Sequence, residues 1–181
     1  QENYPSEKVV NSFGVQDDFM YQYALPILNE RAGTGNPFFC VLLSISNHPP
    51  YVIPPYFHPH SDVLEEQIVE YADWSIRQFM QAAEKQPWFD NTIFVFLGDH
   101  GKMVGTPECE MPQSYNHIPL MIYGKDIKPG VYDGFGGQVD VSPTLLGLLN
   151  ISYLQNNFGV NLLEEERPCM FFTADNLIGA R

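Results

Sequence analysis

Three short apolar runs limit what this chain can fold into. They span residues 38–45, 92–97 and 118–123, each long enough for one strand, and none alternates strictly between apolar and polar residues. Strands without such alternation are typically covered on both faces, as in a parallel sheet flanked by helices. We therefore expect the three runs to be neighbouring strands of one mainly parallel sheet.

Helical patterns precede, separate and follow these runs. The longest covers residues 62–85, where Asp62 and Glu65 have the spacing of a capping box. A shorter helix is predicted over residues 18–30, and another is predicted to start at Ser142-Pro143, because proline suits the first turn of a helix. Strands that alternate with helices indicate an α/β fold, with the longest helix packed on the sheet.

Size and charge narrow the class of protein. The 181 residues suffice for one domain, which we expect to span residues 1–181. The formal net charge of −13 repels a phosphate backbone, so no nucleic-acid partner is expected. No apolar run of the sequence approaches the roughly 18 residues that a transmembrane helix needs.

The segment Gly98-Asp99-His100-Gly101 directly follows the second apolar run. Ligands of open α/β sheets bind at the carboxyl ends of strands, which is where this segment is expected. A carboxylate oxygen and an imidazole nitrogen together suit a divalent transition metal, and flanking glycines allow the backbone to turn. The alternative is an ordinary strand-to-loop turn, in which Asp99 caps the turn and His100 has no role.

Other histidines also stand near the ends of the runs. His48 follows the first run, in the sequence SNHPPY, and His117 precedes the third, in the sequence NHIPL. Each has a plainer interpretation: His48 as a loop histidine in a proline-rich turn, His117 as a cap at a strand start. His58 and His60 have a spacing that can clamp a metal, but their proline-rich surroundings favour a solvent-facing loop.

Taken in order, these segments resemble the motifs of a known family. They are similar to the sulfatase-like enzymes of the alkaline phosphatase superfamily, and most of all to lipoteichoic-acid-synthase-type phosphoglycerol transferases. Residues 98–101 match that family's second metal-ligand motif, and residues 46–51 match its SNHxPY segment. The resemblance runs from about residue 14 to residue 163, and its other segments are 71–73, 116–120, 137–146 and 158–163.

The resemblance implies a role for each candidate residue. Asp99 and His100 would be metal ligands, His48 would contact the phosphate or sulfate group of the substrate, and His117 would lie near the same pocket. The expected ion is Mn²⁺, with Mg²⁺, Zn²⁺ or Ca²⁺ as alternatives. In this family the ion activates a threonine nucleophile, or a modified Cys or Ser in sulfatases, and stabilises charge on the transferred group. That group then passes from the covalent intermediate to water or a sugar hydroxyl.

The family's nucleophile and first acidic ligand are not recognisable in this sequence. In relatives they precede the block that begins near residue 14, and no Thr or Ser in residues 1–37 opens a helix after a buried strand. Thr144 is better explained as part of a helix start, and Thr106 as a loop residue. The chain is therefore expected to be a C-terminal fragment of one catalytic domain, inactive by itself.

The resemblance also implies a location and a substrate class. Relatives of the phosphoglycerol-transferase type carry transmembrane helices before an extracytoplasmic catalytic domain. By resemblance, the full protein would be anchored at the extracytoplasmic face of the bacterial cell membrane and would act on a phospholipid headgroup or an envelope glycan. Two alternatives stay open. One is a true sulfatase or phosphodiesterase that transfers the group to water, and the other is a non-catalytic remnant that binds a glycan or a partner.

Overall fold

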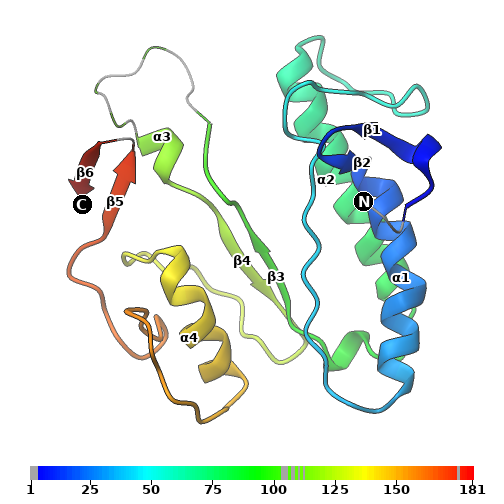
Figure 1. The fold of residues 1–181 in the computed structure, drawn as a ribbon. Coiled ribbons are helices and arrows are strands. Elements are labelled where there is room, and N and C mark those ends of the chain that lie inside the picture. The colour runs from blue at the N-terminus through cyan, green and yellow to red at the C-terminus, as the bar shows by residue number, and fades with distance from the viewer. Residues whose placement is uncertain (1–3, 103–105, 107–108, 110, 112, 175) are drawn as a thin grey trace. The chain divides into compact units, whose positions relative to one another are not determined.

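The computed structural model describes residues 4–102, 106, 109, 111, 113–174 and 176–181. The chain forms two compact units, Gln1–Thr92 and Ile93–Arg181, whose elements are labelled in Figure 1. The strands described in each unit form small two-stranded antiparallel sheets, one in the first unit and two in the second.

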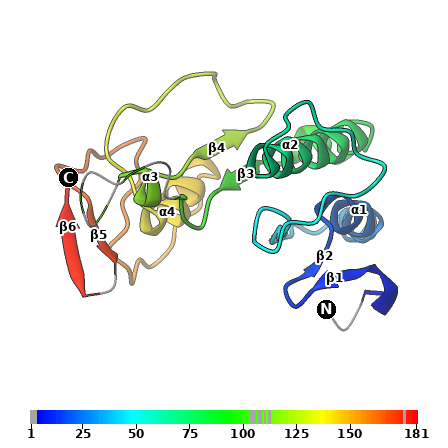
Figure 2. The ribbon, with the colours of Figure 1, turned by 90° about the horizontal axis from the view of Figure 1, so that it is seen from above.

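Two long helices lie side by side in the first unit (Figures 1 and 2). Helix α1 is Asp17–Gly33 and helix α2 is Leu64–Ala83, so both helices predicted for this part of the chain are confirmed within a few residues. The smaller elements are η1 (Ser6–Lys8), the hairpin of β1 (Val9–Asn11) and β2 (Gly14–Val15), and η2 (Phe89–Asn91).

The core of the first unit lies between α1 and α2. The ring of Tyr21 stacks on Phe79 with 5.0 Å between ring centroids. The hydroxyl of the fully buried Tyr71 donates to a carboxylate oxygen of Asp18 over 2.6 Å. The buried apolar residues of the two helices are Met20, Ala24, Leu28, Ile68, Tyr71, Phe79 and Ala83.

Helix α2 begins differently from the prediction. Its N-cap is Val63, which has an extended backbone and makes no side-chain cap, so the expected capping box of Asp62 and Glu65 does not form. The loop before the helix is held by other groups. The Val63 N–H donates to the hydroxyl of Ser61 over 3.1 Å, and the Ser61 N–H donates to Glu70 within the helix over 3.0 Å.

Residues 38–45 do not form a strand, contrary to the prediction. They run extended, but no described residue pairs with them in a sheet. Leu42 lines an apolar hollow together with side chains of α1, whereas Phe39, Val41 and Leu43 at the alternate positions are 86%, 71% and 73% exposed. The segment thus shows the alternating exposure of a strand. It forms no sheet with the described residues, because a ladder needs a second strand to bond its backbone groups.

The second unit is built around a hairpin-like pair of strands. Strands β3 (Phe94–Leu97) and β4 (Leu120–Tyr123) confirm the two other predicted strands. They pair antiparallel, with Phe94 opposite Tyr123 and Leu97 opposite Leu120. The expected parallel pairing is therefore not what the described strands form, since the chain turns back through α3 (Gln113–Asn116) and returns along β3 in the opposite direction.

A helix and a second hairpin complete this unit. Helix α4 is Gln138–Leu148, and the hairpin consists of β5 (Phe171–Ala174) and β6 (Leu177–Ala180). The predicted start of α4 at Ser142-Pro143 is wrong. The helix begins earlier because the N–H of its N-cap, Gly137, donates to the carboxylate of Asp140 over 2.9 Å, and Pro143 lies inside the helix.

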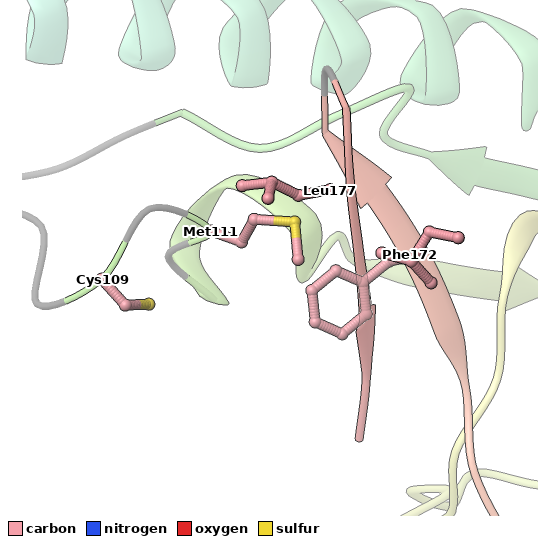
Figure 3. Close-up of a pocket in the computed structure, with 5 residues that line it drawn as sticks. Cys109, Met111, Phe172 and Leu177 are labelled. Carbon is pink, nitrogen blue, oxygen red and sulfur yellow. The ribbon is translucent and has the colours of Figure 1, made fainter.

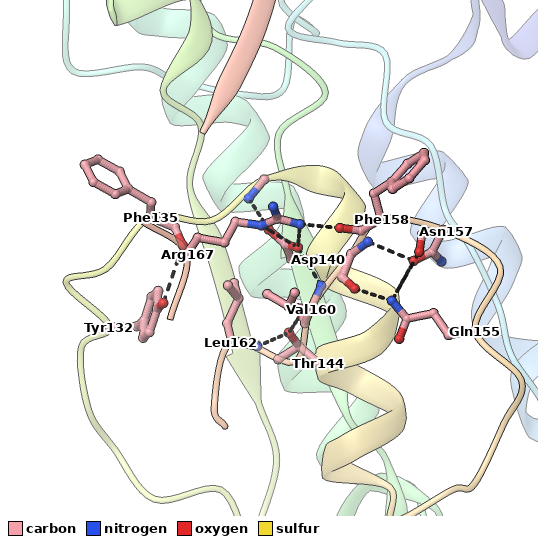
Figure 4. A network of polar contacts seen from close by, with 12 residues as sticks. Tyr132, Phe135, Asp140, Thr144, Gln155, Asn157, Phe158, Val160, Leu162 and Arg167 are labelled. Carbon is pink, nitrogen blue, oxygen red and sulfur yellow. Dashed lines mark hydrogen bonds and ion pairs between the residues drawn. The ribbon is translucent and has the colours of Figure 1, made fainter. Parts of the chain in front are cut away.

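Asp140 also ties α4 to the chain that follows it (Figure 4). Its fully buried carboxylate accepts hydrogen bonds from Nε of Arg167 at 2.8 and 2.9 Å and from Nη2 at 2.6 Å. The backbone N–H of Val160 donates to it over 2.8 Å. Burial alone would raise the pKa of Asp140, but the bonds from Arg167 and from the backbone hold that pKa below its ordinary value.

Residues 158–163 pack closely against α4 (Figure 4). Pro143 has no N–H, which leaves the Val139 carbonyl without its usual helical donor. The backbone of Gly159 approaches so closely that a Cβ there would lie 2.0 Å from the Val139 carbonyl oxygen. The buried hydroxyl of Thr144 accepts from the Leu162 N–H over 3.1 Å, so this threonine has a structural role.

Candidate metal and substrate site

Asp99 and His100 lie just beyond the end of β3, at the edge where the sequence predicted a site. Both side chains are exposed, by 79% and 55%. A carboxylate oxygen of Asp99, Oδ2, lies 3.8 Å from Nε2 of His100. The other oxygen, Oδ1, accepts the backbone N–H of His100 over 2.9 Å. The pair therefore presents one oxygen and one nitrogen close together in solvent.

The ring of His100 is fixed by two contacts. Its Nδ1 lies 2.7 Å from the carbonyl oxygen of Gly101. A carbonyl oxygen can only accept, so Nδ1 carries the hydrogen and Nε2 of the neutral ring keeps its lone pair. Tyr115 stacks on the ring, with 5.4 Å between centroids and 25° between planes. Nε2 is the nitrogen that faces Asp99, and it is the one free to bind a metal.

Close packing requires glycine at position 101 and leaves little room for a larger residue at position 98. A Cβ at Gly101 would lie 2.1 Å from the carbonyl oxygen of Ser114, and one at Gly98 would lie 3.3 Å from the Cβ of Ile118. Neither glycine has a positive φ. The N–H of Gly101 donates to the carbonyl oxygen of Tyr115 over 2.8 Å, and the N–H of Gly98 donates to that of Pro119 over 3.3 Å. The segment before β4 thus lies directly against the Asp99-His100 turn.

The donor atoms of Asp99 and His100 fit a divalent ion in part. Ligand distances of about 2.0–2.2 Å allow two donors roughly 4 Å apart to share one ion, and a carboxylate with an imidazole suits Mn²⁺, Zn²⁺ or Fe²⁺. Among the described residues, no third His, Cys, Asp or Glu joins them in a cluster. Two protein ligands are fewer than the three that catalytic metal sites usually have.

His117 belongs to the same neighbourhood. It is exposed and lies between α3 and β4, in the segment whose Tyr115 and Pro119 carbonyls accept the N–H groups of Gly101 and Gly98. These two bonds bracket His117 along the chain. The backbone around it therefore lies opposite the Asp99-His100 turn.

His48 is in the first unit, in an exposed loop with a buried base. Its Nδ1 lies 2.7 Å from the Pro49 carbonyl oxygen, which leaves Nε2 available, and its ring contacts Phe13 at 4.1 Å between centroids. The loop begins at Ser46. The backbone N–H groups of Ser46 and Ile45 donate to Oδ1 of the buried Asp17 over 3.0 and 2.9 Å.

Below this loop, the start of α1 is a buried polar layer. The Asp17 N–H donates to Ser46 Oγ over 3.1 Å, and that hydroxyl donates to Oε1 of Gln16 over 3.1 Å. The amide of Gln16 in turn donates to the Val52 carbonyl over 2.9 Å. The layer pins both ends of the loop that carries His48. Sequence reasoning did not identify this layer, because its partners are about 30 residues apart along the chain.

Two tyrosines beside this layer titrate late. Burial raises the pKa of Tyr21 to about 12, with the nearby Asp17 carboxylate adding to the effect. Burial, followed by the hydrogen bond to Asp18, raises the pKa of Tyr71 as well. Both rings therefore stay neutral at a pH where an unperturbed tyrosine, with a pKa near 10, ionises.

These shifts predict a loss of stability at high pH. Because the folded-state pKa of Tyr21 is raised, the stability it contributes is complete below a pH of about 10 and is lost as the pH rises through about 12. A tyrosinate absorbance titration should show a late step that coincides with unfolding, and Tyr21→Phe should reduce its amplitude near pH 12. The same amplitude in the variant would show that Tyr21 ionises earlier.

Two other features are less suited to the chemistry. His60, whose side chain is 98% exposed, pairs through Nδ1 with Glu70 at 3.1 Å, and this pair helps to hold the loop before α2.

A hollow beside the C-terminal hairpin is lined by Cys109, Met111, Phe172, Leu177 and Ile178 (Figure 3). These described side chains carry no charge, so they offer a phosphate or sulfate ester no ionic partner.

Comparison with known proteins decides the family. Residues 1–151 match the family model described as Sulfatase. The chain belongs to the sulfatase family. Lipoteichoic acid synthase 1 of Bacillus subtilis is 26% identical over 190 residues, covering 88% of this chain and 28% of that protein. The choline-sulfatase of Rhizobium meliloti is 29% identical over 121 residues, covering 59% of this chain and 22% of that enzyme.

Solved structures of the alkaline phosphatase superfamily confirm the α/β fold class. A Vibrio parahaemolyticus member of that superfamily superposes with a TM-score of 0.87 at 27% identity, covering 99% of this chain and 45% of that one. The lipoteichoic acid synthase of Listeria monocytogenes gives a TM-score of 0.75 at 26% identity, covering 90% and 46%. The sulfatase-family chain thus spans less than half of each structure that it matches.

Proposed function

We propose that this sulfatase-family chain is the C-terminal part of a longer catalytic domain that transfers a phospho group with the help of a divalent ion. The observation that carries the proposal is the Asp99-His100 turn. At the end of β3 it presents a carboxylate oxygen and an imidazole nitrogen 3.8 Å apart, with the ring tautomer that leaves Nε2 free. The similarity to lipoteichoic acid synthases supports phosphoglycerol-type transfer over other reactions of the family.

Two observations support a longer domain. The chain covers 28% of the length of the Bacillus subtilis synthase and 22% of the choline-sulfatase. In addition, the extended segment of residues 38–45 exposes alternate apolar side chains and has no described strand beside it. We infer that the missing strands, the third metal ligand and the hydroxyl nucleophile belong to the remainder of the protein.

The residues of this chain would divide the work of the reaction. Asp99 and His100 would hold the ion, with Mn²⁺ the first choice and Mg²⁺, Zn²⁺ or Ca²⁺ as alternatives. A bound divalent ion lowers the pKa of a nearby hydroxyl and neutralises charge on a transferred phosphoryl group. His48 and His117 would bind the oxygens of that group. A histidine whose Nδ1 is pinned, as in His48, can donate from Nε2 when protonated.

The substrate and location follow from the relatives and are part of the proposal. A phospholipid headgroup or an envelope glycan would be the substrate, at the extracytoplasmic face of a membrane to which the full protein is anchored. Among the described residues, no helix is both long enough and apolar enough to cross a bilayer.

Hydrolysis is the second candidate, and the similarity to a choline-sulfatase favours it. In that case water accepts the group, and the ester is a sulfate or a phosphodiester. A non-catalytic remnant is a third candidate, but free donor atoms at a strand end have no use in a remnant.

Activity assays on two proteins test the proposal. With added Mn²⁺, the full-length protein is expected to turn over a p-nitrophenyl phosphodiester, and to do so faster than a p-nitrophenyl sulfate. The 181-residue chain alone is expected to turn over neither, since its described residues offer two clustered ligands and its sequence has no recognisable nucleophile of the family. Preference for the sulfate ester would favour the sulfatase alternative, and robust turnover by the chain alone would contradict the fragment proposal.

A further inference from the structure

The turn that carries Asp99 and His100 is held by a side chain from α4. The amide nitrogen of Gln138 donates to the carbonyl oxygen of Asp99 over 2.8 Å and to that of Gly98 over 3.2 Å. Carbonyl oxygens only accept, so it is the NH₂ end of the amide that faces the turn, and its two hydrogens match two acceptors. A single side chain thus bonds two consecutive peptide groups immediately before His100.

Gln138 is itself firmly placed. It is the first residue of α4, directly after the N-cap Gly137. The Gly137 N–H donates to the carboxylate of Asp140, which is fully buried and bonded to Arg167. The backbone from which Gln138 extends is therefore fixed by the polar network of Figure 4.

The turn is pinned from the other side by the segment before β4. The N–H groups of Gly98 and Gly101 donate to the carbonyls of Pro119 and Tyr115. Gln138 bonds the carbonyl groups of the same turn, so the N–H groups and the carbonyl groups of the turn are each held by a different partner. Together they set the direction in which the exposed Asp99 and His100 side chains leave the chain.

We infer that Gln138 is a positioning residue for the metal site, acting through the backbone of Gly98 and Asp99 without binding the ion. The inference rests on the proposed function, because it assumes that Asp99 and His100 hold the ion. Partners that orient metal ligands typically contribute about 10–100-fold to metal affinity. A Gln138 that only stabilised the fold would change stability and leave metal affinity alone.

Isothermal titration of the metal-free full-length protein with Mn²⁺ tests this. Gln138→Met keeps the size of the side chain and removes the donor, and it should raise the Kd for Mn²⁺ about 10–100-fold while leaving the thermal unfolding midpoint of the metal-free protein unchanged. Gln81→Met, at an exposed position of α2, is the matched control and should leave the Kd unchanged. An unchanged Kd in Gln138→Met would overturn the inference.

A second variant separates positioning from folding and from charge. Gln138→Glu keeps the shape but places acceptor oxygens against two carbonyl oxygens, so it should also weaken Mn²⁺ binding. If charge alone mattered, the added carboxylate would strengthen binding of a cation, and that result would also overturn the inference.

Failure of the proposed function gives a different pattern. If the wild-type protein binds Mn²⁺ and Asp99→Ala abolishes binding, the site is as proposed, and the Gln138 variants then decide the inference alone. If Asp99→Ala binds Mn²⁺ as tightly as wild type, the metal role of the turn fails and the inference fails with it.

Discussion

Asp140→Ala is expected to destabilise the second unit by about 3–5 kcal/mol, the usual cost of removing one partner from a buried ion pair. The carboxylate is fully buried, and it accepts three bonds from Arg167 and one each from the N–H groups of Val160 and Gly137. Alanine would leave the guanidinium without its partner and two backbone donors without an acceptor. It would also remove the carboxylate that caps α4.

Native-state amide hydrogen exchange in α4 measures this effect where it occurs. Asp73→Ala is a matched control, because Asp73 forms an exposed i,i+4 pair with Arg77 at 3.2 Å. An exposed pair of this kind contributes at most about 1 kcal/mol. Exchange in α4 that is equally fast in both variants would show that the Asp140 network does not hold the second unit together.

Asp99→Ala and His100→Ala are each expected to reduce turnover by the full-length protein by more than about a hundredfold. A hundredfold loss of activity is about the largest effect of removing a residue that only supports metal ligands, and loss of a ligand itself should exceed it. Both side chains are exposed, and neither belongs to the buried core. The stability of the metal-free protein should therefore change little, which separates loss of the site from loss of the fold.

Two measurements accompany these variants. Turnover is followed with the phosphodiester substrate over a range of Mn²⁺ concentrations, and urea unfolding is followed in the metal-free proteins. His60→Ala is the control, because its exposed ring pairs with Glu70 within the first unit and has no part in the proposed site, and full activity is expected. Wild-type turnover by His100→Ala would remove the metal role of that residue.

Parts of this fold follow directly from local sequence pattern. Residues 62–85 carry apolar side chains at helical spacing, and α2 forms there with Ile68, Tyr71 and Phe79 buried. Strands β3 and β4 form where apolar runs stand between turns. The turn with Asp99 and His100 lies at the strand end because the apolar run stops at Leu97.

Other parts depend on partners far along the chain, which local pattern does not reveal. Ser142-Pro143 has the composition of a helix start, but the buried Asp140 caps α4 earlier and draws the proline into the helix. Gln138 bonds Asp99 and Gly98, which lie 39 and 40 positions earlier in the chain, so this link is invisible in the sequence. Residues 38–45 have the composition of a buried strand, yet they remain unpaired among the described residues, because composition does not supply a neighbouring strand.

The location of the ion tests the central claim most directly. Crystals of the full-length protein grown with Mn²⁺ would reveal it by anomalous diffraction at the manganese absorption edge. We expect a peak about 2.0–2.3 Å from a carboxylate oxygen of Asp99 and from Nε2 of His100, completed by ligands from the rest of the protein. An ion bound elsewhere, with Asp99 and His100 both facing solvent, would contradict the metal site and the function proposed from it.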